Sequence, residues 1–181
     1  NNNPIVLELA CGRGEYAVGL GEMFPEKNFI GVDIKGNRMY LGAKKALDKQ
    51  LHNVGFLRTQ IEMLPDYFGT EEVDEIWITF PDPQLRTSKA KKRLTHPRFL
   101  RLYQKVLKKN GVIHLKTDSP HLFRFTKLVS DMYGISIIES CDNVYAQLEI
   151  DKRLTIKTHY ESLDIAGSNK IFYIKLSLPD T

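Results

Sequence analysis

Residues 8–17 read ELACGRGEYA, and this stretch decides the fold. It follows the apolar run Pro4–Ala10 and precedes a helix-like segment, which is the strand, glycine turn and helix order of nucleotide-binding α/β proteins. Asp33 lies 21 residues after Gly12, at the end of the next apolar run. Gly12 and Gly14 let the backbone approach a ligand closely, and an acid at that distance can bind a ribose. The stretch therefore predicts a nucleotide site at the end of the first strand.

The charge around this loop favours S-adenosylmethionine (SAM) over NAD. NAD would bring a pyrophosphate dianion to the turn, whereas SAM brings a sulfonium and an ammonium group. Glu8 lies just before the loop, and Asp82 follows the fourth predicted strand, so two carboxylates are expected at one edge. Carboxylates repel pyrophosphate and attract cations. NAD remains an alternative, as does a tight turn whose glycines serve packing alone.

Apolar runs alternate with helix-like segments along the whole chain. This alternation predicts a doubly wound α/β fold with a mostly parallel sheet covered on both faces. The last run follows no long helix, so we expect it to insert antiparallel. The predicted strands are Pro4–Ala10, Asn28–Val32, Val54–Leu57, Val73–Phe80, Val112–Leu115, Ile135–Ile138 and Ile171–Leu176. The predicted helices are Glu15–Phe24, Lys35–Leu51, Pro97–Lys109 and Ser119–Tyr133.

The composition is that of an ordinary globular domain. The 181 residues are 42% hydrophobic and 27% charged, so we expect one domain over residues 1–181. No run approaches the roughly 20 apolar residues that a membrane span needs. The first residue is not Met and the first strand begins within a few residues, which suggests that an N-terminal segment precedes this chain. Two cysteines form no disulfide framework, so we expect a cytoplasmic protein.

Positive charge is concentrated in one part of the chain. Residues 83–117 contain eleven Lys or Arg and no Asp or Glu, although the net charge of the chain is only +4. A solvated helix face is the ordinary explanation of a charge run. The absence of acids favours a polyphosphate partner instead, which indicates nucleic acid.

Three more motifs follow predicted strands or lie near the last one. Asp82 stands between two prolines in Phe80-Pro-Asp-Pro, which presents its carboxylate from a stiff loop, although an ordinary Asp-Pro turn would look the same. Asp118 follows the fifth strand, where a helix cap is the alternative role. Residues 158–161, Thr-His-Tyr-Glu, lie in a long polar stretch before the last strand. The histidines show no spacing typical of a metal site, so no metal is expected.

Together these motifs resemble the bacterial tRNA (guanine-N7-)-methyltransferases, over nearly the whole chain and in the family's order. The motifs are the glycine loop, Phe80-Pro-Asp-Pro with the basic run after it, Thr117-Asp118, and Thr158-x-x-Glu161. The resemblance implies a Rossmann-like class I methyltransferase fold with seven strands. It also implies SAM as methyl donor and a guanosine of the tRNA variable loop, at position 46, as acceptor. No protein partner or membrane is implied, and a monomer or a homodimer would both suit.

The resemblance assigns roles to particular residues. It implies that Asp82 is the active-site aspartate and also lies beside the cofactor. The residues that it implies for SAM are Glu8, Gly12, Gly14, Asp33, Thr59, Gln60 and Ile61. The residues that it implies for the tRNA are Arg86, Asp118, Thr158, His159, Tyr160 and Glu161.

The chain departs from the family pattern at four places. Ala10 replaces the first glycine of the loop, Gln84 replaces a tryptophan, and Lys89 replaces a histidine of the basic run. The aspartate usual after the third strand is missing, and Thr59 or Gln60 stands there. This change leaves open a non-catalytic RNA-binding subunit, and a methyltransferase for ribosomal RNA, a protein or a small molecule is the other alternative.

Overall fold

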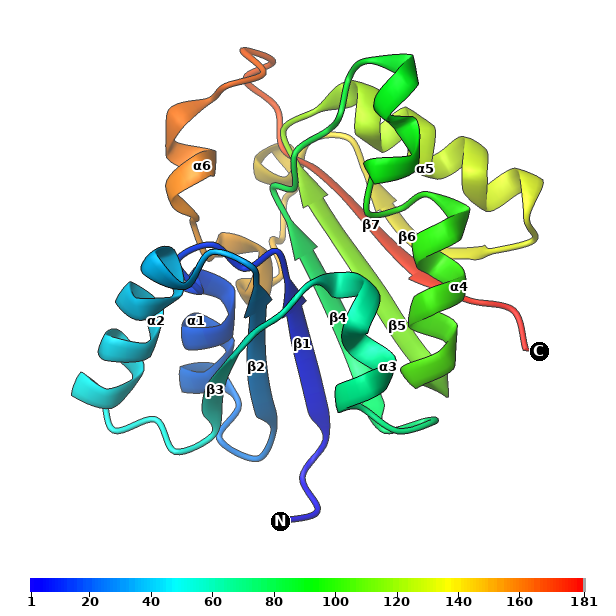
Figure 1. Cartoon of the computed structure of the whole chain (residues 1–181). Helices are drawn as coiled ribbons and strands as arrows, with labels where there is room; N and C mark the ends of the chain where they lie inside the picture. Colours follow the sequence, from blue (N-terminus) through cyan, green and yellow to red (C-terminus); the bar gives the residue numbers. More distant parts are fainter. Residues whose placement is uncertain (181) are drawn as a thin grey trace.

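A seven-stranded sheet forms the centre of the molecule, in the computed structural model that describes residues 1–180 (Figure 1). The strand order is β3-β2-β1-β4-β5-β7-β6. Strands β1 to β5 are parallel, and β7 runs antiparallel to both β5 and β6. The strands are β1 (Ile5–Leu9), β2 (Asn28–Asp33), β3 (Val54–Arg58), β4 (Val73–Thr79), β5 (Leu107–Thr117), β6 (Ser136–Cys141) and β7 (Phe172–Ser177). The predicted fold class, including the antiparallel last strand, is confirmed.

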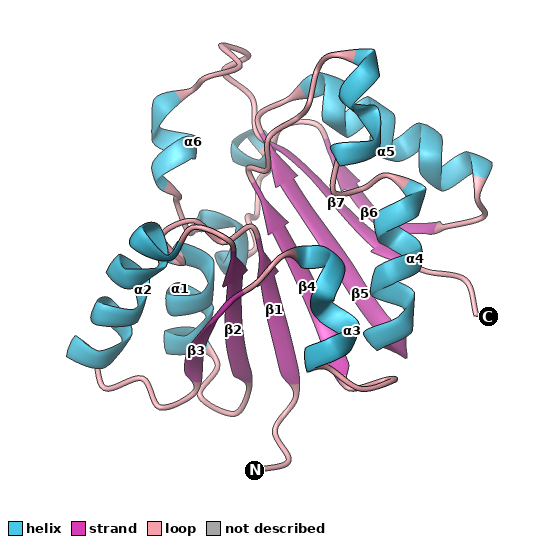
Figure 2. Ribbon diagram, in the orientation of Figure 1, coloured by secondary structure: helices cyan, strands magenta, loops and turns pink. Residues whose placement is uncertain are grey.

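Helices cover both faces of the sheet (Figure 2). The α-helices are α1 (Glu15–Met23), α2 (Gly36–Asp48), α3 (Leu64–Tyr67), α4 (Pro97–Val106), α5 (Pro120–Met132) and α6 (His159–Leu163). The 3-10 helices are η1 (Ile61–Met63), η2 (Thr87–Lys92), η3 (Val144–Ala146) and η4 (Lys152–Thr155). Among residues 1–180, no helix is both long enough and apolar enough to span a membrane.

One face of the sheet, which we call the apolar face, carries only hydrocarbon side chains in its centre. Leu7, Ile78 and Leu115 are fully buried there against α3, α4 and α5. Because paired residues of neighbouring strands lie on the same side of the sheet, a single layer of Leu and Ile forms across β1, β4, β5 and β7. This layer makes the larger of the two hydrophobic clusters.

The opposite side, which we call the polar face, places ionisable groups among aromatic rings. Trp77 stacks on His114 with the ring centroids 3.9 Å apart, and Nδ1 of His114 hydrogen-bonds the Tyr173 hydroxyl at 2.7 Å. Glu8 and Lys116 lie on this face as well, because Glu8 pairs with Trp77 in the register and Lys116 pairs with Tyr173. Helix α1 and the 3-10 helices η3 and η4 cover it.

The predicted helix Pro97–Lys109 is wrong at its end. Helix α4 stops at Val106, and β5 begins at Leu107 rather than at Val112. Leu107 pairs with Val73 at the start of β4, and the register then shifts so that Glu75 pairs with Val112. Pairing with β4 therefore overrides the helical pattern of the sequence. Strand β6 also differs, since it begins at Ser136 and extends three residues beyond the predicted end at Ile138.

Candidate active site

The loops after β1, β2, β3, β4 and β5 meet at one edge of the sheet, where the strands end at their carboxyl termini. Figure 1 shows these strands pointing the same way and α6 standing beyond their ends, next to α1 and α2. In doubly wound sheets this edge holds the ligand. The predicted site residues lie near the ends of β1 and β2, in these loops, or in α6 and its N-cap, so the fold brings them to one edge.

The glycine loop is tied directly to the end of β2. Gly12 has φ of 55°, and its N–H donates to Oδ2 of Asp33 at 2.9 Å. The N–H of Lys35 donates to the other oxygen, Oδ1, at 3.0 Å. Asp33 therefore fixes the loop and keeps further lone pairs on both oxygens, which is compatible with the ribose contact that the resemblance implies.

Glu8 is a buried carboxyl group with one oxygen left over. Its Oε2 accepts the N–H of Ala17 at 2.6 Å, whereas its Oε1 is buried without a hydrogen-bond partner in the described part of the chain. Burial raises the pKa of Glu8 to about 8, and the charges of Glu15 and Asp33 add to this effect. Such a group lacks a positive partner, so a cationic ligand at the glycine loop would fit it.

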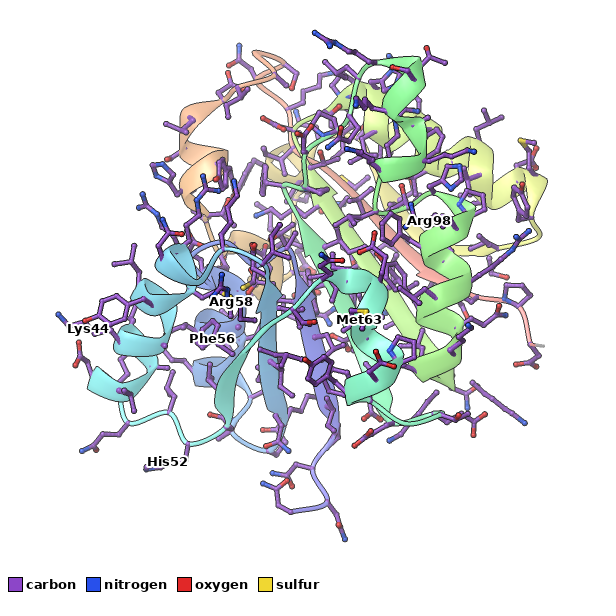
Figure 3. The ribbon with its side chains drawn as sticks, viewed as in Figure 1. Lys44, His52, Phe56, Arg58, Met63 and Arg98 are labelled. Carbon is purple, nitrogen blue, oxygen red and sulfur yellow. The ribbon has the colours of Figure 1, made fainter. Side chains whose placement is uncertain are left out.

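Gly14 is required for packing as well as for its turn. It has φ of 69°, and a Cβ at Gly14 would lie 2.4 Å from the ring of Phe56. Gly31 and Gly42 leave room for the same ring, with distances of 2.8 Å in both cases. Figure 3 shows Phe56 beside α2. The packing explanation of the glycines therefore holds for Gly14, while Gly12 lies free of Phe56.

The end of β3 lies next to Asp33. The N–H of Thr59 donates to the carbonyl oxygen of Asp33 at 3.0 Å, which keeps Thr59 at the edge of the glycine-loop region. Gln60 is exposed and caps η1, which begins at Ile61. Thr59 and Gln60 thus lie beside Asp33 at the strand ends, whereas Ile61 packs against the larger hydrophobic cluster.

Asp82 is exposed on a turn with unusual backbone geometry. Its Oδ1 accepts the N–H of Gln84 at 2.9 Å. Phe80 and Gln84, on either side of it, have φ of 48° and 49°, in the left-handed region that a bulky residue rarely adopts. The N–H of Phe80 donates to the carbonyl oxygen of Lys116 at 2.8 Å, which holds the turn against the end of β5. Strain of this kind is typical of functional sites.

The basic run divides into exposed and structural residues. Arg86, Lys89, Lys91 and Lys92 are exposed on η2 and at its N-cap, directly after the Asp82 turn. Arg93 is buried instead: its guanidinium donates to the carbonyl oxygen of Gln84 at 3.0 and 3.1 Å and lies over the ring of Phe125. Arg93 thus stabilises the turn and is not available to a phosphate.

Arg98 and Lys108 are also not free on this surface. Arg98 pairs with Glu62 at 3.0 Å, and Figure 3 shows Arg98 on α4. Lys108 pairs with Asp74 at 2.6 Å near the start of β5, at the opposite edge of the sheet. The exposed cations that directly follow the Asp82 turn are those of η2 and its N-cap.

Asp118 contacts the loop that follows α6. Its Oδ2 accepts the N–H of Ala166 at 3.3 Å, and its carbonyl oxygen accepts the hydroxyl of Ser168 at 2.9 Å. Burial raises the pKa of Asp118. The N-cap residue of α5 is Ser119 and not Asp118, because the Ser119 hydroxyl accepts the N–H of Leu122 at 3.1 Å.

The segment 158–161 lies across the cofactor side of the site. Thr158 caps α6 by accepting the N–H of Glu161 at 3.1 Å, and the N–H of His159 donates to Glu15 at 2.9 Å. The Tyr160 ring lies 3.7 Å from the position that a Cβ of Gly12 would occupy. Tyr160 therefore covers the glycine loop.

Arg38 holds Tyr160 in this place and was missed in the sequence. Its guanidinium donates to the Tyr160 hydroxyl and lies 5.6 Å from the ring centroid. The contact joins residues 122 positions apart, so no local pattern announces it.

Glu161 is engaged by two further residues that the motifs did not single out. Its Oε2 accepts from Nζ of Lys116 at 2.8 Å, and its Oε1 accepts from the Tyr145 hydroxyl. The sequence offered one signal for Lys116, because residues 113–116 alternate apolar and polar, which places His114 and Lys116 on one side of the strand.

The comparisons with known proteins agree with this geometry. A family model described as a putative methyltransferase matches residues 2–173. A tRNA (guanine-N(7)-)-methyltransferase from Porphyromonas gingivalis is 53% identical over 98% of this chain and 72% of its own length. The chain belongs to this methyltransferase family. A member from Christiangramia forsetii is 46% identical over 98% of this chain and 80% of its own length.

Solved structures support the methyltransferase fold. The 16S rRNA methyltransferase KamB has a TM-score of 0.71 with 17% identity, over 98% of this chain and 89% of its own. TrmN from Thermus thermophilus has a TM-score of 0.66 with 22% identity, over 98% of this chain and 44% of its own. Membership of the methyltransferase family favours SAM over NAD at the glycine loop.

Proposed function

We propose that this chain transfers a methyl group from SAM to N7 of a guanine in tRNA, in the variable loop at position 46. The names of its 46–53% identical relatives give N7 of a tRNA guanine for those proteins, and the variable loop and its position are what the resemblance of the motifs implies. The proposal includes action in the cytoplasm, as a single methyltransferase domain and as a monomer or homodimer.

One arrangement carries the proposal: the strained Asp82 turn lies between the glycine loop and the exposed basic segment. Asp82 follows β4, whose neighbour β1 leads into the glycine loop, and Arg86 to Lys92 follow the turn directly. A nucleic acid held by η2 would thus present a base to a carboxylate beside the cofactor loop.

The residues present fit SAM. The buried Oε1 of Glu8 has no hydrogen-bond partner and could accept from a cationic ligand, and Gly12 and Asp33 offer a close backbone approach and free lone pairs. When bound, SAM supplies a methyl group activated by its sulfonium. Glu8, Gly12 and Asp33 would hold it, with Thr59, Gln60 and Ile61 beside the adenine.

Asp82 would stabilise the positive charge that the guanine gains. Guanine N7 has a lone pair and no proton, so no residue has to remove a proton before the transfer. The task of the site is therefore to orient the base and to favour the developing charge. The N–H of Gln84 holds one oxygen of Asp82, which aims the carboxylate while leaving lone pairs for the base.

The tRNA backbone would lie on the exposed cations of η2. Arg86, Lys89, Lys91 and Lys92 are exposed, and each phosphate contact adds roughly 0.7 to 0.9 to the slope of log affinity against log salt. The target guanosine has to leave its stack to reach Asp82. Tyr160, Asp118 and the Thr158–Glu161 segment border the space above the strand ends.

The test uses an unmodified tRNA transcript, labelled SAM and mass spectrometry of the digested nucleosides. We expect 7-methylguanosine, and we expect it to disappear when the variable-loop guanosine is replaced. A matched transcript changed at a guanosine outside this loop should still be methylated.

Other outcomes identify the alternatives. Transfer to ribosomal RNA or protein but not to tRNA would contradict the proposed acceptor. SAM binding by calorimetry without transfer to any of these acceptors would favour the non-catalytic RNA-binding subunit.

A further inference from the structure

We propose that Lys116 is a positioning residue, which fixes α6 and the Asp82 turn to each other across the strand ends. The inference deepens the proposed function, because α6 and the Asp82 turn are two walls of the site where the guanine would bind. It rests on the buried contacts of one side chain and on the construction of α6.

The ammonium group of Lys116 is completely buried and has two polar partners. Nζ donates to the carbonyl oxygen of Ile156 at 3.0 Å and to Oε2 of Glu161 at 2.8 Å. The exposed fraction of the side chain is 0% for Lys116 and 5% for Glu161. One partner precedes α6 and the other lies within it, so a single cation holds both sides of the helix start.

Aromatic rings surround the remainder of the ammonium group. The ring centroids of Tyr16, Phe80 and Tyr145 lie 5.3, 5.6 and 5.9 Å from Nζ. Rings in these positions attract a cation but exclude water. Burial lowers the pKa of Lys116, and the Glu161 carboxylate opposes this effect. Because a buried charge without a partner is strongly unfavourable, the ion pair ties Glu161 to one place.

Helix α6 has little else to hold it. It contains five residues, none of which is buried as a whole although the side chain of Glu161 is, and its C-cap residue Asp164 is in a left-handed conformation. A helix this short has no apolar face to anchor it. Its hydrogen bonds to the rest of the protein join His159 to Glu15, Tyr160 to Arg38, and Glu161 to both Lys116 and Tyr145. Among these four partners of the helix, only Lys116 has a side chain that is 0% exposed.

The backbone of Lys116 holds the other wall of the site. Its carbonyl oxygen accepts the N–H of Phe80, whose left-handed φ begins the Asp82 turn. The side chain and the backbone of one residue thus connect Glu161 to the turn that presents Asp82. A shift of about 1 Å between such walls is enough to slow a transfer reaction about 100-fold.

The first test measures amide hydrogen exchange in the full chain with Lys116→Met. We expect residues 156–163 to exchange at least about tenfold faster, because the buried anchor is lost, while α1 exchanges as before. The matched control is Lys108→Met, on the same strand but paired with Asp74 at the opposite edge, which should leave residues 156–163 unchanged. Unchanged exchange in folded Lys116→Met would overturn the proposal.

The second test measures methylation of the tRNA transcript by the same variants. For Lys116→Met we expect kcat to fall at least about 30-fold, with KM for tRNA within about threefold, because η2 still holds the backbone. Lys116→Arg retains the charge and should recover part of kcat. Faster exchange without a change in kcat would overturn the role in the reaction.

A third variant tests the same ion pair in case Lys116→Met does not fold. Glu161→Gln keeps the shape of the partner and removes its charge, and we expect it also to speed exchange in residues 156–163. The double variant Lys116→Met/Glu161→Gln should lower kcat no further than Lys116→Met alone, because each change removes the same ion pair. Additive losses of kcat would contradict the positioning role. If the unchanged protein methylates no tRNA, the proposed function fails, and the exchange data still decide the positioning role.

Discussion

The two faces of the central sheet use the same strands for different purposes. On the apolar face, Leu7 and Leu115 pack into a layer of hydrocarbon against three helices. On the polar face, their neighbours Glu8 and Lys116 are buried ionisable groups that pair in the register with Trp77 and Tyr173. Successive residues of a strand point to opposite faces, so one strand can serve both. The comparison separates the residues that hold the fold from those that prepare the site.

Buried groups on the polar face lower the free energy of unfolding, whereas packing on the apolar face raises it. A buried carboxyl with an unpartnered oxygen, as at Glu8, and a buried ion pair, as at Lys116, both oppose folding relative to apolar side chains of similar volume. We therefore expect changes on the apolar face to lower the free energy of unfolding and changes on the polar face and its rim to lower activity.

The largest effect is expected at Asp82, in the turn at the carboxyl end of β4. Asp82→Asn should lower kcat about 1,000-fold, because an amide cannot balance the charge that the purine gains. The Asn oxygen still accepts the N–H of Gln84, so the turn and the stability should be unchanged. Methylation kinetics measure the loss of rate, and urea denaturation measures the stability. Activity within tenfold of the unchanged protein would remove Asp82 from the proposed mechanism.

The apolar face is tested by Leu115→Ala, next to Lys116. Leu115 is 0% exposed, so the cavity should lower the free energy of unfolding by about 2–5 kcal/mol. Urea denaturation measures this loss. Below the unfolding transition, affinity for S-adenosylhomocysteine should remain unchanged. A selective loss of affinity in this variant would show that the two faces are not independent.

Glu8→Gln tests the cost of the buried carboxyl through pH. The folded carboxyl has a pKa of about 8, whereas the unfolded one titrates near its ordinary value of 4.5. Between these values the unfolded chain gives up its proton first, so rising pH favours unfolding of the ligand-free protein. Glu8→Gln cannot ionise and should be more stable at pH 8 by more than about 1 kcal/mol, with little difference near pH 4.5.

Urea denaturation at several pH values, with both proteins in parallel, measures the Glu8 contribution as their difference. The same variant should bind SAM more weakly, because an amide offers no charge to the sulfonium and ammonium groups. A pH-independent difference in stability would contradict the raised pKa.

The smallest effect is expected at Ala10, at the start of the glycine loop after β1. Its φ is 52°, which costs an L-residue about 1–2 kcal/mol, partly offset by the larger chain entropy of glycine. Ala10→Gly should therefore raise the free energy of unfolding by up to about 1 kcal/mol. Gly12→Ala, at φ of 55°, is the reverse control and should lower it. Denaturation midpoints decide whether both shifts have the expected sign.

Most of the fold could be predicted because the strands of this sheet are short apolar runs. All seven runs became strands, and the lack of a long helix before the last one correctly indicated the antiparallel β7. The start of β5 could not be predicted, because Leu107 continues the helical pattern and its pairing with Val73 is visible only in three dimensions.

The site was predictable where its residues are close in sequence. Glu8 and the glycine loop form one stretch, and a strand end followed by an acid identified Asp33. The contacts of Arg38 and Tyr145 could not be predicted, because they depend on where the 158–161 segment crosses the strand ends. In the sequence Lys116 is one more member of the basic run, and its burial is visible only in the folded sheet.

The cover over the glycine loop also sets an order of events during synthesis. Glu15 and its partner His159 are 144 residues apart, so a ribosome adding 5–20 residues per second makes the loop roughly 7–30 s before the cover. The glycine loop is thus made well before the segment that covers it.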